Sequence, residues 1–163
     1  MSSQKQSETE LQELIGKLSK GDDSVGADDP AARTEQLVTD TSSAMSADGT
    51  LDIDDGLIKH SLSPLLLMLV GLRTDDAHGK GVMEDLTRFF GAELSPGTVY
   101  PALHDLDEDG LLEMHELIQT KEYRIDDDTE VRRTLEDAMQ QHLALGFVFQ
   151  QAIDELDAPS DDV

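Results

Sequence analysis

The chain contains no cysteine and no tryptophan, and only 12 lysines and arginines stand against 36 aspartates and glutamates. Without cysteine, disulfide scaffolds, thiolate zinc sites, iron–sulfur clusters and cysteine nucleophiles are excluded. The longest apolar run, residues 65–70, is six residues long, whereas a membrane-spanning helix needs roughly 20. No basic N-terminus leads into an apolar segment, so a secretory signal is not expected. We therefore expect a soluble, cytoplasmic chain without membrane contact.

The acidic residues are mostly short ones, 23 aspartates and 13 glutamates, and the formal net charge is -24. Short carboxylates hold water and cations, so this composition favours a surface adapted to molar salt and a halophilic archaeon as the source. An acidic disordered protein and a DNA mimic are the alternatives, because net charge reports on solubility and association rather than on fold. Circular dichroism that shows structure only in molar KCl would separate them.

Residues 1–55 are predicted to form an acidic, largely disordered tail. Between residues 21 and 55 the chain has no aromatic side chain, and such a stretch buries too little apolar surface to offset the entropy of ordering it. The exception is a short amphipathic helix at residues 8–20, with Leu11, Leu14, Ile15 and Leu18 at helical spacing. It either docks on its own domain or binds a protein partner.

Two apolar helices are predicted after residue 56. Ser63 and Pro64 give the first a cap and a proline at its opening position, and the apolar run that follows indicates a buried helix. The second runs over residues 77–90 and ends at Gly91, since glycine readily adopts the left-handed conformation that terminates helices.

A third helix is predicted from a second Ser-Pro pair, Ser95 and Pro96, to Gly110. Val99, Leu103 and Leu106 share its inward face. Pro101 should make the first turn irregular, because an interior proline removes a helical hydrogen bond. The side chains left facing away from the core are Thr98, Tyr100, Pro101 and His104.

Two short strands, residues 111–115 and 120–125, follow the third helix and are joined by a turn near residues 117–119. Three helices and a hairpin are typical of a winged helix-turn-helix domain, which we place at residues 56–126. In such domains the third helix enters the DNA major groove. The fold class is thus mostly α with a small β-hairpin.

The segments 77–79, 94–103 and 109–112, which read Ala-His-Gly, Leu-Ser-Pro-Gly-Thr-Val-Tyr-Pro-Ala-Leu and Asp-Gly-Leu-Leu, resemble the PadR family of transcriptional regulators. The resemblance covers residues 60–157. It implies a homodimeric regulator, usually a repressor, that binds an inverted repeat in double-stranded DNA. By position in the family, the start of the recognition helix is matched by Ser95, Pro96, Gly97, Thr98 and Tyr100, and the second wing strand by Lys121 and Arg124.

The second half of the recognition helix departs from the family, because residues 105–109 carry four carboxylates and no arginine or lysine. Cation uptake between carboxylates and phosphates would make DNA affinity flat or rising with KCl, against the usual loss. The alternative is a winged-helix module that binds proteins and not DNA. The candidate DNA-binding residues are Ser95, Pro96, Gly97, Thr98, Tyr100, Pro101, His104, Lys80, Lys121 and Arg124.

A long C-terminal helix is predicted over residues 127–157, ahead of a disordered end at 158–163. Apolar positions spaced alternately by three and four residues form a seam that calls for a partner helix, and we expect it to dimerise the chain rather than fold back on its own domain. The predicted dimerisation residues are Val131, Leu135, Ala138, His142, Leu145, Phe149, Ala152 and Leu156.

The sequence offers no enzymatic constellation. Its five histidines are scattered, without paired-ligand spacing, and carboxylates are so numerous that pairs arise by chance. His104 and Glu108, four residues apart, fit a solvated helix pair better than a metal site. We expect no catalytic residue, no metal and no cofactor.

Overall fold

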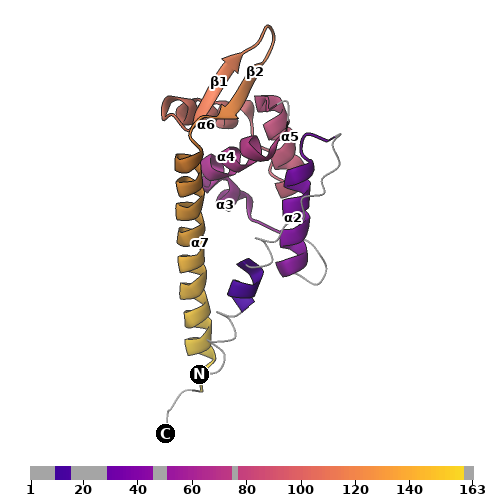
Figure 1. Ribbon diagram of the computed structural model, residues 1–163. Coiled ribbons are helices and arrows are strands. Elements are labelled where there is room, and N and C mark those ends of the chain that lie inside the picture. The colour runs from indigo at the N-terminus through magenta and orange to yellow at the C-terminus, as the bar shows by residue number, and fades with distance from the viewer. Residues whose placement is uncertain (1–9, 16–28, 46–50, 75–76, 160–163) are drawn as a thin grey trace.

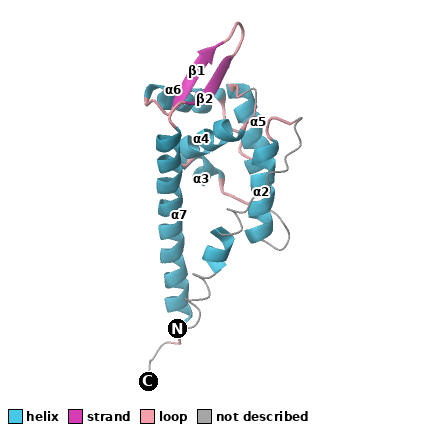
Figure 2. Cartoon of the chain, viewed as in Figure 1, coloured by secondary structure: helices cyan, strands magenta, loops and turns pink. Residues whose placement is uncertain are grey.

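The structure, a computed structural model, describes residues 10–15, 29–45, 51–74 and 77–159. A short helical segment at residues 10–15 comes first. The elements that follow are α2 (Ala32–Met45), α3 (Asp55–His60), α4 (Leu62–Leu72), α5 (Gly79–Phe90), α6 (Pro96–Glu108), β1 (Leu112–Glu116), β2 (Lys121–Ile125) and α7 (Asp128–Asp157). Figure 1 shows helices α2 to α6 capped by the hairpin, with α7 running down past them. We call these helices, the hairpin and the first turns of α7 the head. The fold is a winged helix with a long C-terminal helix, mostly α with one hairpin, as predicted (Figure 2).

Helix α4 lies at the centre of the head. Its residues Leu66, Leu67 and Leu69 are completely buried, and it packs against α3, α5, α6, β2 and α7. A helix that is apolar on nearly every side needs such surroundings. The predicted cap is wrong by two residues: Ser61 precedes α4, and Pro64 lies inside its first turn, where a missing N–H costs no helical bond.

Helices α5 and α6 form the helix-turn-helix. Helix α5 ends as predicted at Gly91, whose φ of 64° is left-handed, and α6 begins directly after Ser95. The irregular first turn expected from Pro101 is not found, because α6 is continuous through that residue. Proline in the second turn removes only the bond to the Gly97 carbonyl, which lies on the exposed side of the helix.

The hairpin pairs β1 with β2 antiparallel, with Met114 opposite Tyr123. It is fixed to the head on both sides, since Tyr123 donates its N–H to the Ala77 carbonyl at 2.9 Å and Asp107 of α6 accepts the Met114 N–H at 3.3 Å. Buried Leu112 and Tyr123 belong to the same core cluster as α4. The wing therefore has a defined orientation relative to α5 and α6.

Helix α7 is capped by Asp127, whose carboxylate accepts the Glu130 N–H at 3.1 Å, and it runs from Asp128 to Asp157, close to the predicted bounds. Its first turns belong to the head, because Val131 is buried and Leu135 packs against the core. Residues 138–157, which we call the stem, run beyond the head (Figure 1). None of the described helices is long and apolar enough to cross a membrane.

The N-terminal region differs from the predicted disordered tail. Residues 32–45 form α2, which packs on α4 and α5, and residues 55–60 form α3. Ala31 is buried, and Arg88 of α5 reaches Asp29 and Glu35, each at 3.2 Å. Burial and ion pairs thus hold a segment that its composition had marked as solvated. Residues 1–9, 16–28, 46–50 and 160–163 lie outside the described part of the chain, so the predicted disorder there stays a prediction.

Only part of the predicted amphipathic helix at residues 8–20 is described. Residues 10–15 are helical, and Leu11 and Leu14 line a cleft of about 520 Å³ together with Met45 of α2 and Gly146 of α7. Both leucines are half-buried. This placement favours docking on the chain itself over a surface left free for a partner.

Candidate nucleic-acid interface

The first two turns of α6 lie at the surface of the head. Its inward side chains Val99, Leu103 and Leu106 are buried, as the spacing predicted. The four side chains predicted to face away from the core are exposed in the structure: Thr98, Tyr100, Pro101 and His104. The residues at the very start of the helix are exposed as well: Ser95, Pro96 and Gly97. Ser95 and Thr98 join their hydroxyl groups at 3.1 Å, which closes the first turn. A polar, exposed helix start of this kind can enter a groove of DNA.

Tyr100 occupies a defined position on this surface. Its side chain is 37% exposed, and its ring lies against Gly79 at the start of α5, so that a Cβ at position 79 would come within 2.8 Å of the tyrosine hydroxyl oxygen. A side chain at position 79 would therefore displace the ring. Glycine there lets α5 and α6 approach and presents the phenol at the surface.

A cleft of about 630 Å³ brings three of the predicted residues together: Lys80 from α5, Tyr100 from α6, and Lys121 from β2. The turn between the two strands forms its remaining wall. Helix-turn-helix and wing thus meet on one surface, and two lysines line the same cleft as the tyrosine.

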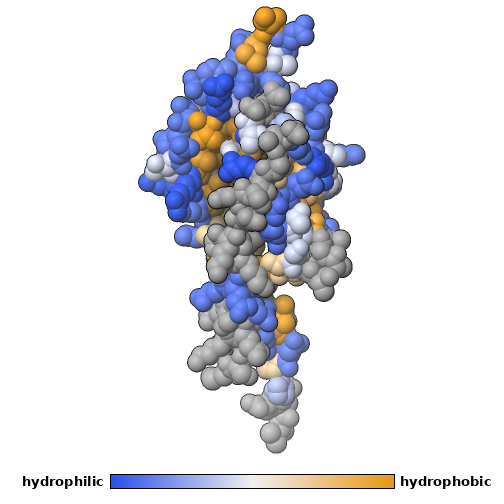
Figure 3. Space-filling model, turned by 45° about the vertical axis from the view of Figure 1, so that its right-hand side comes forward, coloured by the Kyte–Doolittle hydropathy of each residue, from blue (hydrophilic) through white to orange (hydrophobic). Residues whose placement is uncertain are grey.

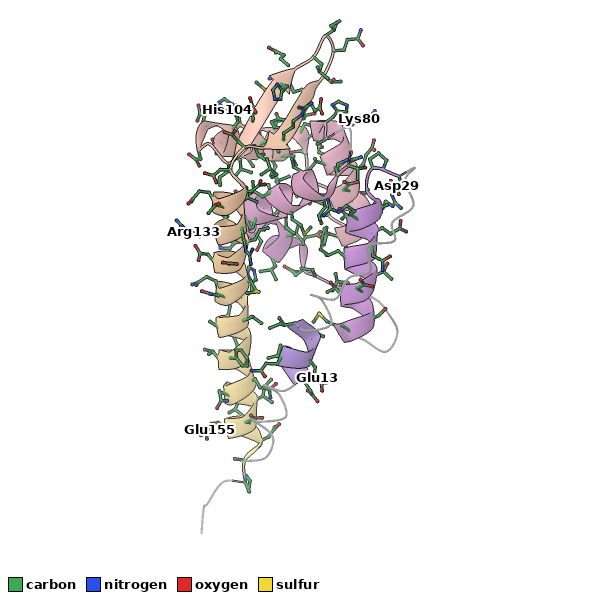
Figure 4. The ribbon with its side chains drawn as sticks, viewed as in Figure 1. Glu13, Asp29, Lys80, His104, Arg133 and Glu155 are labelled. Atoms are coloured by element: carbon green, nitrogen blue, oxygen red, sulfur yellow. The ribbon has the colours of Figure 1, made fainter. Side chains whose placement is uncertain are left out.

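Arg124 and His104 lie away from this cleft. Arg124 lines a separate cleft of about 390 Å³ beside Arg73 and Asp128, and Glu122 lies 3.6 Å from its guanidinium. His104 lies across the head from Lys80 (Figure 4) and is 3.2 Å from Glu108. The predicted set is therefore divided, and Arg124 and His104 each face a carboxylate of their own chain.

The charge of α6 is separated along its length. From residue 94 to residue 103 the sequence has no charged side chain, whereas the next six residues contain Asp105, Asp107, Glu108 and Asp109. Asp107 is half-buried and holds the wing through Met114. The carboxylates that would repel DNA phosphates thus lie on the later turns of the helix, and one of them, Asp107, holds the wing.

A buried ion pair supports the helix-turn-helix from behind. Arg73, which follows α4, contacts the Asp85 carboxylate of α5 at 3.0 Å, and both side chains are less than a tenth exposed. Burial raises the pKa of Asp85 to about 6, although the nearby Arg73 guanidinium opposes that shift. A Cβ at Gly81 would come within 2.6 Å of the Arg73 guanidinium, so the glycine leaves room for the pair.

The predicted dimerisation seam is divided between two uses. Val131 and Leu135 pack in the core of the head, and His142 bonds to the Ser61 hydroxyl at 3.1 Å, so these three residues serve the chain's own fold. Further along, Leu145, Phe149 and Leu156 are 54%, 58% and 84% exposed. The seam available to a partner therefore begins at Leu145 and lies within the stem.

Sequence reasoning missed several features of this surface. The contact of Tyr100 with Gly79 joins residues 21 positions apart, and no local pattern shows it. The Arg73–Asp85 pair is likewise nonlocal. A signal for the exposed Ile118 did exist, because an isoleucine inside a predicted turn is unusual. Among the described residues there is no group of three or more side chains suited to hold a metal ion.

Comparison with known sequences identifies the family to which the central segment of the chain belongs. The sequence model of the transcriptional regulator PadR-like family matches residues 66–134. These residues include most of α4, all of α5, α6 and the hairpin, and the first turns of α7. This segment belongs to the PadR-like family. The match includes the PadR-type motifs of α6 and of the first wing strand.

Two relatives come from halophilic archaea. The chain is 40% identical over 121 residues to the transcriptional activator GvpE of Haloferax mediterranei, which covers 71% of this chain and 62% of the relative. It is 43% identical over 100 residues to the transcriptional activator GvpE1 of Halobacterium salinarum, which covers 58% of this chain and 51% of the relative. The chain thus spans less than two thirds of each relative.

Among solved structures, a PadR-like transcription factor from Bacteroides fragilis aligns with 62% of this chain and 94% of its own, at 19% identity and a TM-score of 0.39. The matching family model describes transcriptional regulators, and the named relatives are transcriptional activators.

Proposed function

We propose that this PadR-like chain is a DNA-binding transcriptional regulator that acts as a homodimer on an inverted repeat. The observation that carries the proposal is the exposed, charge-free start of α6 beside the hairpin and the cleft of Lys80, Tyr100 and Lys121. An uncharged helix start can approach base edges without bringing carboxylates against phosphates. The predicted contacts at Ser95, Gly97 and Thr98 belong to the same surface.

The stem supports the homodimer. Large apolar side chains exposed along one helix are rare on a monomer, and those of the stem lie on a helix that leaves the head (Figure 1). Pairing two stems around a two-fold axis would cover them and would orient two heads symmetrically. Two symmetric heads read two half-sites of opposite direction, hence the inverted repeat.

The sign of regulation is proposed to be activation. The family resemblance led us to expect a repressor, but the relatives named above are both transcriptional activators. A dimer that binds DNA can act in either direction, depending on where its site lies relative to the promoter.

Genomic footprinting of the tagged full chain in its own cells, at native salt, tests this function. Sharp peaks that share an inverted repeat, together with lower transcripts of the adjacent genes when the chain is deleted, are the expected result. A genome without peaks would instead favour the protein-binding winged-helix module, for which the acidic later turns of α6 are the supporting observation.

The salt dependence of DNA binding stays a prediction. The unchanged chain is expected to have a DNA affinity that is flat or rises with KCl. Asp105→Asn and Glu108→Gln together should restore the usual fall of affinity with KCl. Asp107 is left unchanged because its carboxylate accepts the Met114 N–H. Fluorescence anisotropy with the footprinted DNA at several KCl concentrations measures the slope. A steep fall for the unchanged protein would contradict cation uptake.

A further inference from the structure

The turn at the end of the hairpin, residues 117–120, is apolar where hairpin turns are normally polar. The Leu117 N–H donates to the Thr120 carbonyl at 2.8 Å and closes the turn. Ile118 is fully exposed, and Leu117 is half exposed. Turns ordinarily use glycine, asparagine or aspartate, which suit their backbone angles. Ile118 contributes no packing to the described part of the chain, so its side chain is free to contact a partner.

Figure 3 shows hydrophobic surface at the very top of the molecule, over the turn between β1 and β2. No residue of the turn is charged, and at its base Glu116 lies opposite Lys121, so the nearest charges balance. On a chain with a net charge of -24, this is a neutral apolar tip at the outermost point of the wing.

The tip is continuous with the proposed DNA surface. Leu117, Ile118, Gln119 and Thr120 line the same cleft as Tyr100 and Lys80. When the first turns of α6 lie in a major groove, a hairpin beside them reaches the adjacent minor groove. A DNA duplex that Tyr100 contacts therefore passes within reach of the tip.

We propose that the wing tip is an apolar wedge that enters the DNA minor groove, with Ile118 against a base step. This inference rests on the proposed DNA-binding function. Leucine and isoleucine are among the side chains that proteins insert between base steps from the minor groove, where they partly unstack the bases and kink the duplex. A neutral tip reaches the groove without the repulsion that the chain's many carboxylates would meet at the phosphates.

Molar salt favours such a wedge over a basic wing. At an ionic strength of about 1 M the Debye length is only about 3 Å, so the attraction between a lysine and a phosphate is largely screened. Contact between an isoleucine and a base is apolar and does not depend on released counterions. The wedge would therefore keep DNA affinity under conditions in which phosphate contacts lose theirs.

The test compares the full chain with Ile118→Ser on the footprinted DNA in molar KCl. Anisotropy should show affinity lower by about tenfold to a hundredfold, which corresponds to the loss of one buried isoleucine side chain. In DNA with 2-aminopurine at the flanking minor-groove steps, the unchanged chain should raise the fluorescence by unstacking, and Ile118→Ser should not. Ile118→Phe, which keeps an apolar wedge, should retain the fluorescence rise.

Leu57→Ser is the matched control, since Leu57 is a half-exposed leucine of α3, a helix that lies apart from the hairpin (Figure 1), and it should alter neither readout. Ile118→Lys should bind with a steeper fall in salt and without unstacking. If the unchanged chain binds no DNA, the proposed function itself fails. Equal affinity and equal fluorescence for the unchanged chain and Ile118→Ser would overturn the wedge alone. Loss of gene regulation with DNA binding intact would assign the tip to a protein partner and overturn it too.

Discussion

The head and the stem use the same kind of side chain for opposite purposes. In the head, Leu66, Leu86 and Leu103 are completely buried around α4. In the stem, which continues the same helix that closes the head, the large apolar side chains lie exposed: Leu145, Val148, Phe149, Ile153 and Leu156. One unbroken helix thus contributes to folding with its first turns and leaves an apolar surface exposed on its later ones. Changes in the stem should separate subunits, and changes in the head should alter stability or DNA binding.

The largest effect is expected in the stem. Replacing both Leu145 and Phe149 with aspartate should convert the proposed dimer to a monomer, because each change removes a large apolar side chain worth a few kcal/mol in a packed seam and adds a charge there. Light scattering in molar KCl measures the mass. Gln140→Glu is the control, as it adds charge to an exposed position of α7 away from the seam and should leave the dimer intact.

Val131→Asp sharpens the contrast within the same helix. Because Val131 is buried in the head, the charged variant should lose the folded head itself, seen by circular dichroism. The double stem variant should keep its helical signal. A stem variant that stays dimeric would show that the two regions are not divided as described.

The next effect is on the pH dependence of the head. Because Asp85 has a pKa of about 6 in the folded chain against an ordinary value of 3.8, the folded state binds this proton more tightly than the unfolded chain. The free energy of unfolding should therefore rise as the pH falls through about 6, by up to about 3 kcal/mol, and be lost again as the pH rises.

Urea unfolding of the unchanged chain and of Asp85→Asn, at pH values on both sides of 6 in molar KCl, isolates this group from the other carboxylates. The difference in stability between the two proteins should move in favour of the unchanged chain at low pH. A difference that does not change with pH would mean that Arg73 keeps the carboxylate ionised throughout.

Tyr100 should affect binding more than folding. Tyr100→Ala should weaken specific DNA binding by about 1–3 kcal/mol, the range for one base-edge contact, with little change in melting temperature since the ring is partly exposed. Gly79→Ala keeps the phenol but displaces it, and it should weaken binding as well. If Tyr100→Ala unfolds the head, the tyrosine belongs to the core and not to the DNA surface.

The smallest effect concerns the attachment of α2 to the head. Arg88→Gln removes both ion pairs to Asp29 and Glu35, but these side chains are about half exposed, and exposed pairs contribute less than about 1 kcal/mol. Hydrogen exchange in α2 should rise slightly while α4 and α5 keep their protection. Complete loss of protection in α2 would show that the ion pairs, and not Ala31 and its neighbours, hold the helix.

The sequence predicted the elements whose signals are local. Gly91 was predicted to end α5, and Ser95 to precede α6. Asp127 and Asp157 were predicted as the first and last residues of α7. The structure has Gly91 as the C-cap of α5, Ser95 and Asp127 as the N-caps of α6 and α7, and Asp157 as the last residue of α7. The hairpin was predicted to within a residue at each end. Caps, left-handed glycines and alternating strands act over a few residues, so a single sequence displays them.

Helix α2 could not be predicted because its pattern is reversed. It buries Thr34 and Ser42 while Leu37 and Met45 are exposed, so hydrophobic periodicity carries no signal. In α7 the pattern is present but does not distinguish two environments. Val131 and Leu145 belong to the same heptad pattern, although Val131 is buried in the head and Leu145 is exposed to solvent. Periodicity identifies an apolar face but not the surface that will cover it.

The junction between the wing and α7 gives the molecule a fixed geometry. Only Asp126 and Asp127 separate β2 from a helix of 30 residues, so a dimer built on the stem would hold its two heads at the ends of stiff rods. Each residue inserted near Ala138 would turn the seam by about 100° and lengthen the rod by about 1.5 Å. A single insertion should therefore misalign both half-sites, whereas an insertion of seven residues, close to two turns, should restore their relative phase at a greater separation.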